Sequence, residues 1–184
     1  MENRYVKELR SRATYGDNGY EKLFQYPSGY RNVRNELIRK YSFAIPNEEA
    51  LSVFSKYEPI VEVGCGDGYW SYLLQERDVS VVATDVSAPA SPWTKVRKMC
   101  ATKAVSKFPR HTVFFCWPEY GGEWSHKTLE HYSGDTVIYV GDEELTGSDG
   151  FHSHLEKNFK KVLSIPLPTW ERINDGLRVF ERDF

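Results

Sequence analysis

The chain has 184 residues, of which 40% are hydrophobic, 15% aromatic and 27% charged, and its formal net charge is -2. This composition is that of an ordinary globular protein and excludes a collagen-like, coiled-coil or disordered chain. The length favours a single domain, and the small net charge argues against a protein that holds nucleic acid by bulk electrostatic attraction.

Hydropathy and cysteine content bear on the compartment. The mean hydropathy is -0.56, and no apolar run reaches the ~18 residues of a transmembrane helix, so we expect no membrane partner. The first residues, MENRYVKELRSR, contain no apolar segment, and we expect no secretory signal. The three cysteines, Cys65, Cys100 and Cys116, have no CxxC spacing. They predict free thiols in a cytoplasmic or otherwise intracellular location.

Residues 1–40 are expected to form an N-terminal arm and the first helix. The arm is polar up to residue 34, with turn-rich stretches at 16–19 and 26–30, and a short helix is expected over 34–40. Residues 41–184 then form the main domain. Its first helix is predicted over 47–56, because Asn47 follows a proline and precedes two glutamates, which is typical of a helix start.

Strands alternate with helices from residue 58 onward. Apolar and β-branched runs predict strands at 59–64, 79–85, 111–118, 135–141, 159–166 and 176–184, with a weaker one at 95–99. Helical stretches are predicted at 69–77, 101–108, 122–132 and 148–159. This alternation indicates an α/β fold with a largely parallel sheet. The last two strands are joined by a segment too short for a crossover helix, so they are expected to pair antiparallel.

A glycine-rich segment carries the clearest chemical signal. Glu62 precedes Gly64, Gly66 and Gly68, which follow the first strand of the domain and open a helix. Glycines there let the backbone turn tightly and approach a ligand closely. Asp85 ends the next strand, 17 residues after Gly68. Neighbouring strand ends would place this acid where it accepts both hydroxyls of a ribose, which predicts a cofactor that contains a nucleoside.

The spacing of the glycines bears on which cofactor is bound. The dinucleotide fingerprint is GxGxxG, but here the third glycine comes one residue early and Tyr69 occupies its place. Glu62 would repel a pyrophosphate and suit a cationic ligand. The pattern resembles motifs I and II of class I S-adenosylmethionine-dependent methyltransferases. A nicotinamide or flavin fold and a chance glycine turn remain alternatives.

This resemblance implies roles for individual residues. Glu62 would hold the amino-acid end of S-adenosylmethionine, the Gly64–Gly68 loop with Cys65 would pass under its methionine and ribose, and Asp85 would bind the ribose hydroxyls. The cofactor site is predicted to include four more residues, Tyr69, Trp70, Val86 and Trp117. For Tyr69 and Trp70 the alternative is a place in the helix core. By resemblance alone, Tyr41 and Ser42 would close over the methionine end.

A wider resemblance covers residues 40 to 184. The stretches YSFAIPNEEAL, PIVEVGCGDGYW, VVATD, FFCWPEY, GDTVIYVGDEELTG and PTWERINDGLRVFER are similar to a family of small, largely uncharacterised methyltransferase-like proteins with IPxxEAL, ExGxGxGYW and WPPY-type motifs. The family implies a Rossmann-like sheet of seven strands in the order 3-2-1-4-5-7-6, with the last strand antiparallel. It implies S-adenosylmethionine as cofactor but supplies no substrate.

The sequence Trp117-Pro118-Glu119-Tyr120 ends the fourth strand of the domain. It is similar to the (Asp/Asn/Ser)-Pro-Pro-(Tyr/Phe) block of amino-methyltransferases but departs at two of four positions. An indole can only donate a hydrogen bond, which argues against methylation of a base nitrogen. We expect Trp117, Glu119 and Tyr120 on the substrate side, with nearby carbonyls free to orient a nucleophile because Pro118 lacks a donor. The alternatives are a core position for Trp117 and a surface position for Glu119.

Other candidate residues carry less weight. Glu119, Asp142 and Glu143 at strand ends are candidate bases. His152 and His154 diverge if they lie on a helix, so no metal site is predicted. No GxSxG sequence occurs, which argues against a hydrolase.

Charge is unevenly distributed along the chain. Residues 86–118 contain six basic residues and no carboxylate, whereas residues 119–149 contain eight carboxylates and one lysine. These stretches are either solvated faces or a charged rim on a substrate cleft. The predicted function is methyl transfer from S-adenosylmethionine to an unidentified small molecule, protein or nucleic acid. The alternatives are a degenerate domain that binds cofactor or partner without catalysis, and a nucleic-acid-binding module using residues 95–110.

Overall fold

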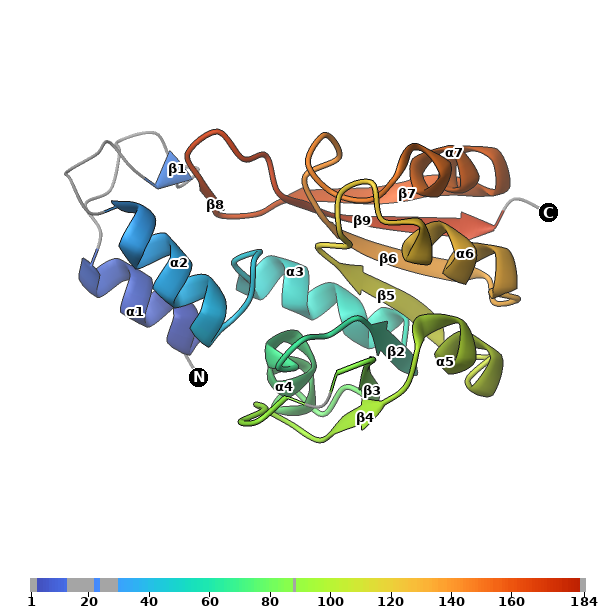
Figure 1. The fold of residues 1–184 in the computed structure, drawn as a ribbon, viewed down its shortest axis with the longest axis horizontal. Helices are drawn as coiled ribbons and strands as arrows, with labels where there is room; N and C mark the ends of the chain where they lie inside the picture. Colours follow the sequence, from blue (N-terminus) through green and yellow to red (C-terminus); the bar gives the residue numbers. More distant parts are fainter. Residues whose placement is uncertain (1–2, 13–21, 24–29, 88, 183–184) are drawn as a thin grey trace.

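The computed structural model describes residues 3–12, 22–23, 30–87 and 89–182. Seven strands form the main sheet in the order β4-β3-β2-β5-β6-β9-β7 (Figure 1). Their bounds are Ile60–Val63 (β2), Val81–Asp85 (β3), Val96–Lys98 (β4), Thr112–Cys116 (β5), Thr136–Gly141 (β6), Phe159–Pro166 (β7) and Gly176–Arg182 (β9). Only β9 is antiparallel to its neighbours β6 and β7 in this sheet. Numbered in chain order, the strands read 3-2-1-4-5-7-6, which confirms the predicted topology.

The sheet separates two apolar cores. Successive side chains of a strand point to opposite faces, and Phe114 and Phe115 of β5 accordingly belong to different cores. One core holds the helices α5 (Ala101–Lys107), α6 (Glu123–His131) and α7 (Asp149–Asn158). The other holds α3 (Glu48–Val53), the short 3₁₀ helix η1 (Phe54–Lys56) and α4 (Tyr69–Gln75). The central strands β2, β5 and β6 are therefore buried on both faces, as a covered parallel sheet requires, whereas the edge strands β4 and β7 are largely exposed.

The predicted helix starting near residue 47 is present. The Asn47 side chain accepts a hydrogen bond from the Ala50 backbone N–H at 2.9 Å and so caps α3. No helix among the described residues is long and apolar enough to cross a membrane.

The N-terminal region contains two helices, α1 (Arg4–Arg12) and α2 (Tyr30–Lys40), at one end of the molecule (Figure 1). The sequence analysis expected only the second, whereas Tyr5 and Leu9 of α1 are buried in the same core as α4. The two-residue strand β1 (Lys22–Leu23) pairs with β8 (Thr169–Trp170). The expected turns at 16–19 and 26–29 lie outside the described residues, and the division into arm and domain stays a prediction.

Candidate functional site

The glycines between β2 and α4 occupy backbone conformations that other residues rarely adopt. Gly64, Gly66 and Gly68 have φ values of +67°, +56° and +76°. A Cβ at Gly64 would lie 3.0 Å from the Trp124 ring, and one at Gly68 would lie 3.1 Å from the Thr94 side chain. The chain therefore needs glycine at these positions to turn from strand to helix.

Asp85 at the end of β3 holds this loop in place. Its Oδ2 accepts a hydrogen bond from the Gly66 backbone N–H at 2.9 Å, and its Oδ1 accepts one from the Ser87 N–H at 2.8 Å. The Cys65 N–H donates to the Thr84 carbonyl at 3.0 Å. The glycine loop and the end of β3 thus form one connected unit, as the motif spacing predicts.

A cavity of about 270 Å³ lies against the glycine loop. Its other walls are the end of β5 and the segment 38–43, which runs from the last turn of α2 toward α3. The lining residues are Ile38, Arg39, Tyr41, Ser42, Phe43, Glu62, Gly64, Cys65, Gly66, Asp67, Tyr69, Trp70, Cys116 and Trp117. The cavity brings together most of the predicted cofactor residues. The predicted cofactor residues outside its lining are Gly68, Asp85 and Val86, and two of the predicted substrate-side residues, Glu119 and Tyr120, also lie outside it.

Glu62 is the buried acid of the cavity, with 1% of its surface exposed. Its Oε2 accepts hydrogen bonds from the backbone N–H and the hydroxyl of Ser71. Burial raises the pKa of Glu62 to about 7, although the bonds from Ser71 oppose this shift. Because no cation is bonded to this carboxyl among the described residues, a cationic group entering the cavity would stabilise its charged form.

Two thiols line the same cavity. Burial raises the pKa of the Cys65 thiol and of the Cys116 thiol, and the nearby Glu62 carboxyl adds to both shifts. Both thiols are therefore protonated at neutral pH and are poor nucleophiles.

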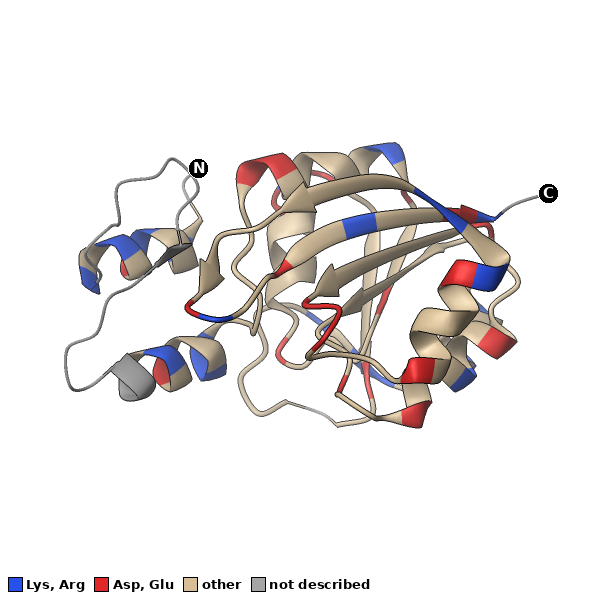
Figure 2. Ribbon diagram, turned by 90° about the horizontal axis from the view of Figure 1, so that it is seen from above, with Lys and Arg blue, Asp and Glu red and all other residues tan. Residues whose placement is uncertain are grey.

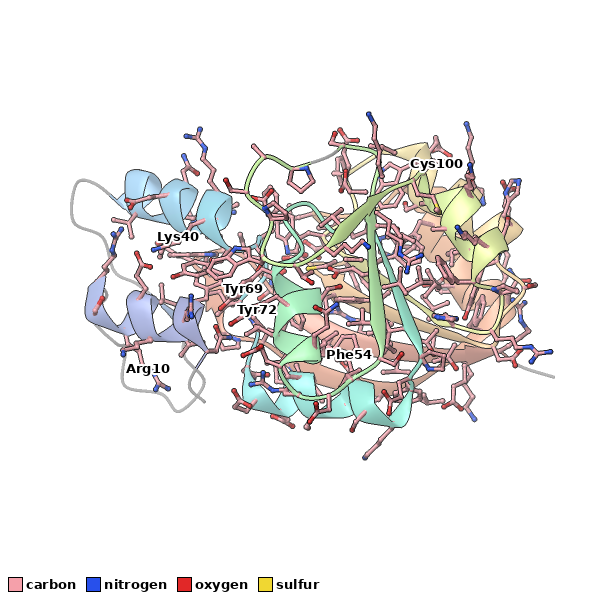
Figure 3. The ribbon with its side chains drawn as sticks, turned by 90° about the horizontal axis from the view of Figure 1, so that it is seen from below. Arg10, Lys40, Phe54, Tyr69, Tyr72 and Cys100 are labelled. Carbon is pink, nitrogen blue, oxygen red and sulfur yellow. The ribbon has the colours of Figure 1, made fainter. Side chains whose placement is uncertain are left out.

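An aromatic cluster connects the segment 38–43 to the glycine loop. Tyr41 stacks on Trp93 at a centroid distance of 5.4 Å, and Tyr69 at the start of α4 contacts both rings. The Trp93 indole N–H donates to the Lys40 carbonyl at 2.8 Å, and its backbone N–H donates to Asp67. In Figure 3, Tyr69 and Tyr72 extend from α4, and Lys40 extends from the end of α2. Tyr69 therefore packs in the core and lines the cavity as well.

Trp117 forms the wall at the end of β5, beside the glycine loop, because β5 is the parallel neighbour of β2. It has φ +52°, its ring stacks on Phe43 at 5.1 Å, and its indole N–H donates to Asp175 Oδ1 at 2.7 Å. The Pro118 carbonyl accepts a hydrogen bond from the Gly147 N–H at 2.9 Å. The Glu119 carbonyl accepts one from the Gly122 N–H at 3.1 Å, so two of the carbonyls in this turn, which were expected to be free to orient a nucleophile, already have protein donors.

Asp175 is the residue that the sequence analysis missed. It immediately precedes β9, is 4% exposed, and its Oδ2 has no hydrogen-bond partner. Burial raises the pKa of Asp175 to about 7, opposed by the bond from Trp117. It lies 58 residues from Trp117 in the chain, and no local pattern indicates that the two meet.

The three candidate bases have structural partners or lie in solvent. Asp142 is buried and accepts hydrogen bonds from the backbone N–H groups of Asn174 and Glu144, at 2.7 and 2.9 Å. Glu143 pairs with Arg178 at 3.1 Å. Glu119 is exposed. None of the three lines the cavity beside the glycine loop.

The basic stretch lies away from this cavity. Its six basic residues, all exposed, are on or next to β4 and α5: Lys95, Arg97, Lys98, Lys103, Lys107 and Arg110. None of them lines the cavity. These basic residues are therefore solvated surface residues and do not form a charged rim on this cavity.

Comparisons with known proteins support the fold. No protein-family model and no curated protein matches the chain. Among solved structures, the 1,6-didemethyltoxoflavin-N1-methyltransferase of Burkholderia thailandensis, with bound 1,6-didemethyltoxoflavin and S-adenosylhomocysteine, is 10% identical, with 94% of this chain and 99% of that chain covered and a TM-score of 0.57.

Two further structures have the same fold. Magnesium protoporphyrin IX methyltransferase from Synechocystis, with bound S-adenosylmethionine, is 13% identical over 98% of both chains, at a TM-score of 0.52. A protein of the NADB-Rossmann superfamily from Streptococcus agalactiae is 14% identical over 78% of this chain and 72% of that one, at 0.51. At such low identity these likenesses establish a Rossmann-like fold of the class I methyltransferase type.

Proposed function

We propose that the chain binds S-adenosylmethionine in the cavity beside the glycine loop and transfers its methyl group to an acceptor. The observation that supports this proposal best is that Glu62, the Gly64–Asp67 loop and Trp117 line one cavity. Asp85 is bonded to the same loop. The loop lets a ligand approach the backbone, Glu62 suits a cationic amino acid, and Asp85 suits ribose hydroxyls. Two of the solved structures that share the fold contain this cofactor or its demethylated product.

The chemistry asks little of the protein beyond positioning. The sulfonium carbon is reactive, so an acceptor held in line with the methyl group needs only to lose one proton. Trp117 would lie on the acceptor side, held by Asp175 and stacked on Phe43. The two neutral thiols in the lining would not compete for the methyl group as thiolates.

Thermal unfolding with added ligands tests this proposal. S-adenosylmethionine or S-adenosylhomocysteine should raise the melting temperature, because a ligand at ~100 times its dissociation constant adds ~2.7 kcal/mol to the stability. NAD should have no such effect. Equal stabilisation by NAD, or none by any of the three ligands, would reject the cofactor. Extracts incubated with labelled S-adenosylmethionine would then identify the acceptor.

One observation favours a second candidate, a domain that binds the cofactor without methyl transfer. Both polar groups of the Trp117–Pro118 turn that face neighbouring loops already have protein partners, Asp175 and Gly147. In that case S-adenosylmethionine would bind and stabilise the protein, but no extract would yield a methylated product.

A further inference from the structure

The cavity beside the glycine loop contains unpaired charges of opposite sign. Glu62 uses only Oε2 for its bonds to Ser71, and its Oε1 accepts no hydrogen bond from a described residue. Asp67 also lines the cavity, and its side chain has no hydrogen-bond partner in the described part of the chain. Arg39, in the last turn of α2, is the single cation among the described lining residues.

Arg39 differs from three other basic residues of the two N-terminal helices, Arg12, Lys40 and Arg4, which all have protein partners. Both N-terminal helices are rich in lysine and arginine (Figure 2). Arg12 pairs with Glu36 at 2.9 Å, Lys40 pairs with Glu8 at 2.6 Å, and Arg4 lies over the Trp93 ring. The Arg39 guanidinium has no ion pair, ring contact or hydrogen bond with any described residue. It is thus the cation of the α2 terminus left free to bind a ligand.

These charges complement the amino-acid end of the proposed cofactor. S-adenosylmethionine carries an ammonium, a sulfonium and one carboxylate, and the cavity offers two carboxylates and one guanidinium. A guanidinium binds a carboxylate through two parallel hydrogen bonds, which makes it a specific partner for that group. Glu62 and Asp67 line the cavity on the glycine-loop side, whereas Arg39 comes from the segment 38–43, which forms another of its walls.

We infer that Arg39 binds the α-carboxylate of the cofactor, while Glu62 binds its α-ammonium group. This inference rests on the proposed function, because it takes the ligand to be S-adenosylmethionine. It makes the N-terminal helices part of the cofactor site, since the aromatic contacts of Tyr41 and Trp93 fix the α2 terminus over the glycine loop. A chain lacking α2 would then bind the nucleoside but lose selectivity for the amino acid.

Two ligands that differ only in the carboxylate test the inference. Calorimetric titrations would compare S-adenosylmethionine with its decarboxylated form, on the wild-type protein and on Arg39→Gln. The wild type should prefer the carboxylate form by about ten-fold or more, the size of a charge-assisted hydrogen bond. Arg39→Gln should lose this preference through weaker binding of S-adenosylmethionine alone. Arg39→Lys should fall between them, because it keeps the charge without the fork geometry.

Arg110→Gln is the matched control, because Arg110 is exposed and lies outside the cavity, and it should keep the wild-type preference. The inference is overturned if Arg39→Gln keeps this preference, or if the substitution lowers the affinity for both ligands equally. If the wild-type protein binds neither ligand, the proposed function is overturned together with the inference. Binding of both ligands by the wild type with equal affinity overturns the inference alone.

Discussion

The two walls of the cavity differ in how their polar groups are used. On the cofactor side, Glu62 keeps one carboxylate oxygen without a hydrogen bond from a described residue, and the exposed Arg39 of the segment 38–43 has no partner among the described residues. On the side of Trp117, the indole is bonded to Asp175 and the Pro118 carbonyl to Gly147. A buried carboxylate such as Glu62 with an unpaired oxygen is prepared for a ligand, because burying an unpaired group costs free energy that a ligand can return. On the Trp117 side the unpaired buried oxygen, Asp175 Oδ2, belongs to a residue outside the cavity lining, and the groups of the Trp117–Pro118 turn are bonded to neighbouring loops.

This difference bears on how specific each half of the site is. The glycine-loop side presents charges and backbone positions that fit one kind of molecule. The Trp117 side presents two stacked rings, Phe43 and Trp117, and an aromatic surface accepts many flat or apolar groups. On the proposed function, the acceptor would be selected by shape more than by charge, whereas the cofactor would be selected by charge.

Replacing Gly64 by alanine should disrupt the glycine-loop wall most. Its φ of +67° and the contact of 3.0 Å with Trp124 combine backbone strain with overpacking, at a cost of about 2–4 kcal/mol. Gly66→Ala is the matched control, because a Cβ there meets nothing within 4 Å and only the backbone cost of about 1 kcal/mol remains. Urea unfolding would measure the loss of stability in both variants. Equal losses would show that Trp124 does not constrain the loop.

Asp85→Ala should weaken binding of S-adenosylhomocysteine more than it harms folding. The change removes the acceptor for the Gly66 N–H and, on the proposed function, for two ribose hydroxyls. Such bonds correspond to roughly ten- to a hundred-fold in affinity. Calorimetric titration of the folded variant measures the affinity for S-adenosylhomocysteine. The control is Asp135→Ala, because Asp135 is an exposed acid before β6. Wild-type affinity in Asp85→Ala would remove this residue from the site.

Trp117→Phe should lower stability while leaving cofactor affinity within about threefold. The change deprives the buried Asp175 of its hydrogen bond, which costs about 1–3 kcal/mol when a buried polar group loses its partner. Urea unfolding and calorimetry on the same variant separate the two effects. An affinity loss as large as that of Asp85→Ala would show that both walls bind the cofactor. Once an acceptor is known, Trp117→Ala should reduce methyl transfer more than cofactor binding.

Much of the fold could be predicted from local patterns. Apolar runs predict most of the strands and helices after residue 58, because the central strands are covered on both faces and the helices bury one face. The start of α3 followed from Asn47, whose side chain caps the first turn. Helix α1 was missed because its sequence is dominated by charges, and its two buried residues, Tyr5 and Leu9, give a weak apolar stripe.

The candidate site, like the fold, could be predicted only in part. The glycines and Asp85 could be predicted, because tight turns at neighbouring strand ends demand particular residue types at fixed spacings. Asp175 and Arg39 could not, since their importance comes from contacts between segments far apart in the chain. The pairing of the Pro118 carbonyl with Gly147 was equally invisible. The roles of Val86 and Tyr120, which are 63% and 73% exposed, stay predictions.

The pH dependence of binding should separate the two buried acids, Glu62, which lines the cavity, and Asp175, which is bonded to Trp117 but lies outside the lining. Burial raises the pKa of both Glu62 and Asp175 to about 7, so each is partly protonated at neutral pH. A bound ammonium group favours the charged form of Glu62 and lowers its pKa, so binding releases a proton and strengthens as pH rises from 6 to 8. The gain should stay within about tenfold, because a carboxyl with a pKa of about 7 goes from roughly one-tenth to nine-tenths ionised between pH 6 and pH 8.

Calorimetric titration of S-adenosylhomocysteine at pH 6, 7 and 8 measures this effect. Glu62→Gln should bind more weakly at pH 8 and show no gain with pH, because its amide does not titrate. Asp175→Asn should keep the full pH dependence, since its partner is the Trp117 indole and it is absent from the cavity lining. A flat wild-type profile would place the ammonium group away from Glu62. Loss of the dependence in Asp175→Asn would instead assign the released proton to the Trp117 wall.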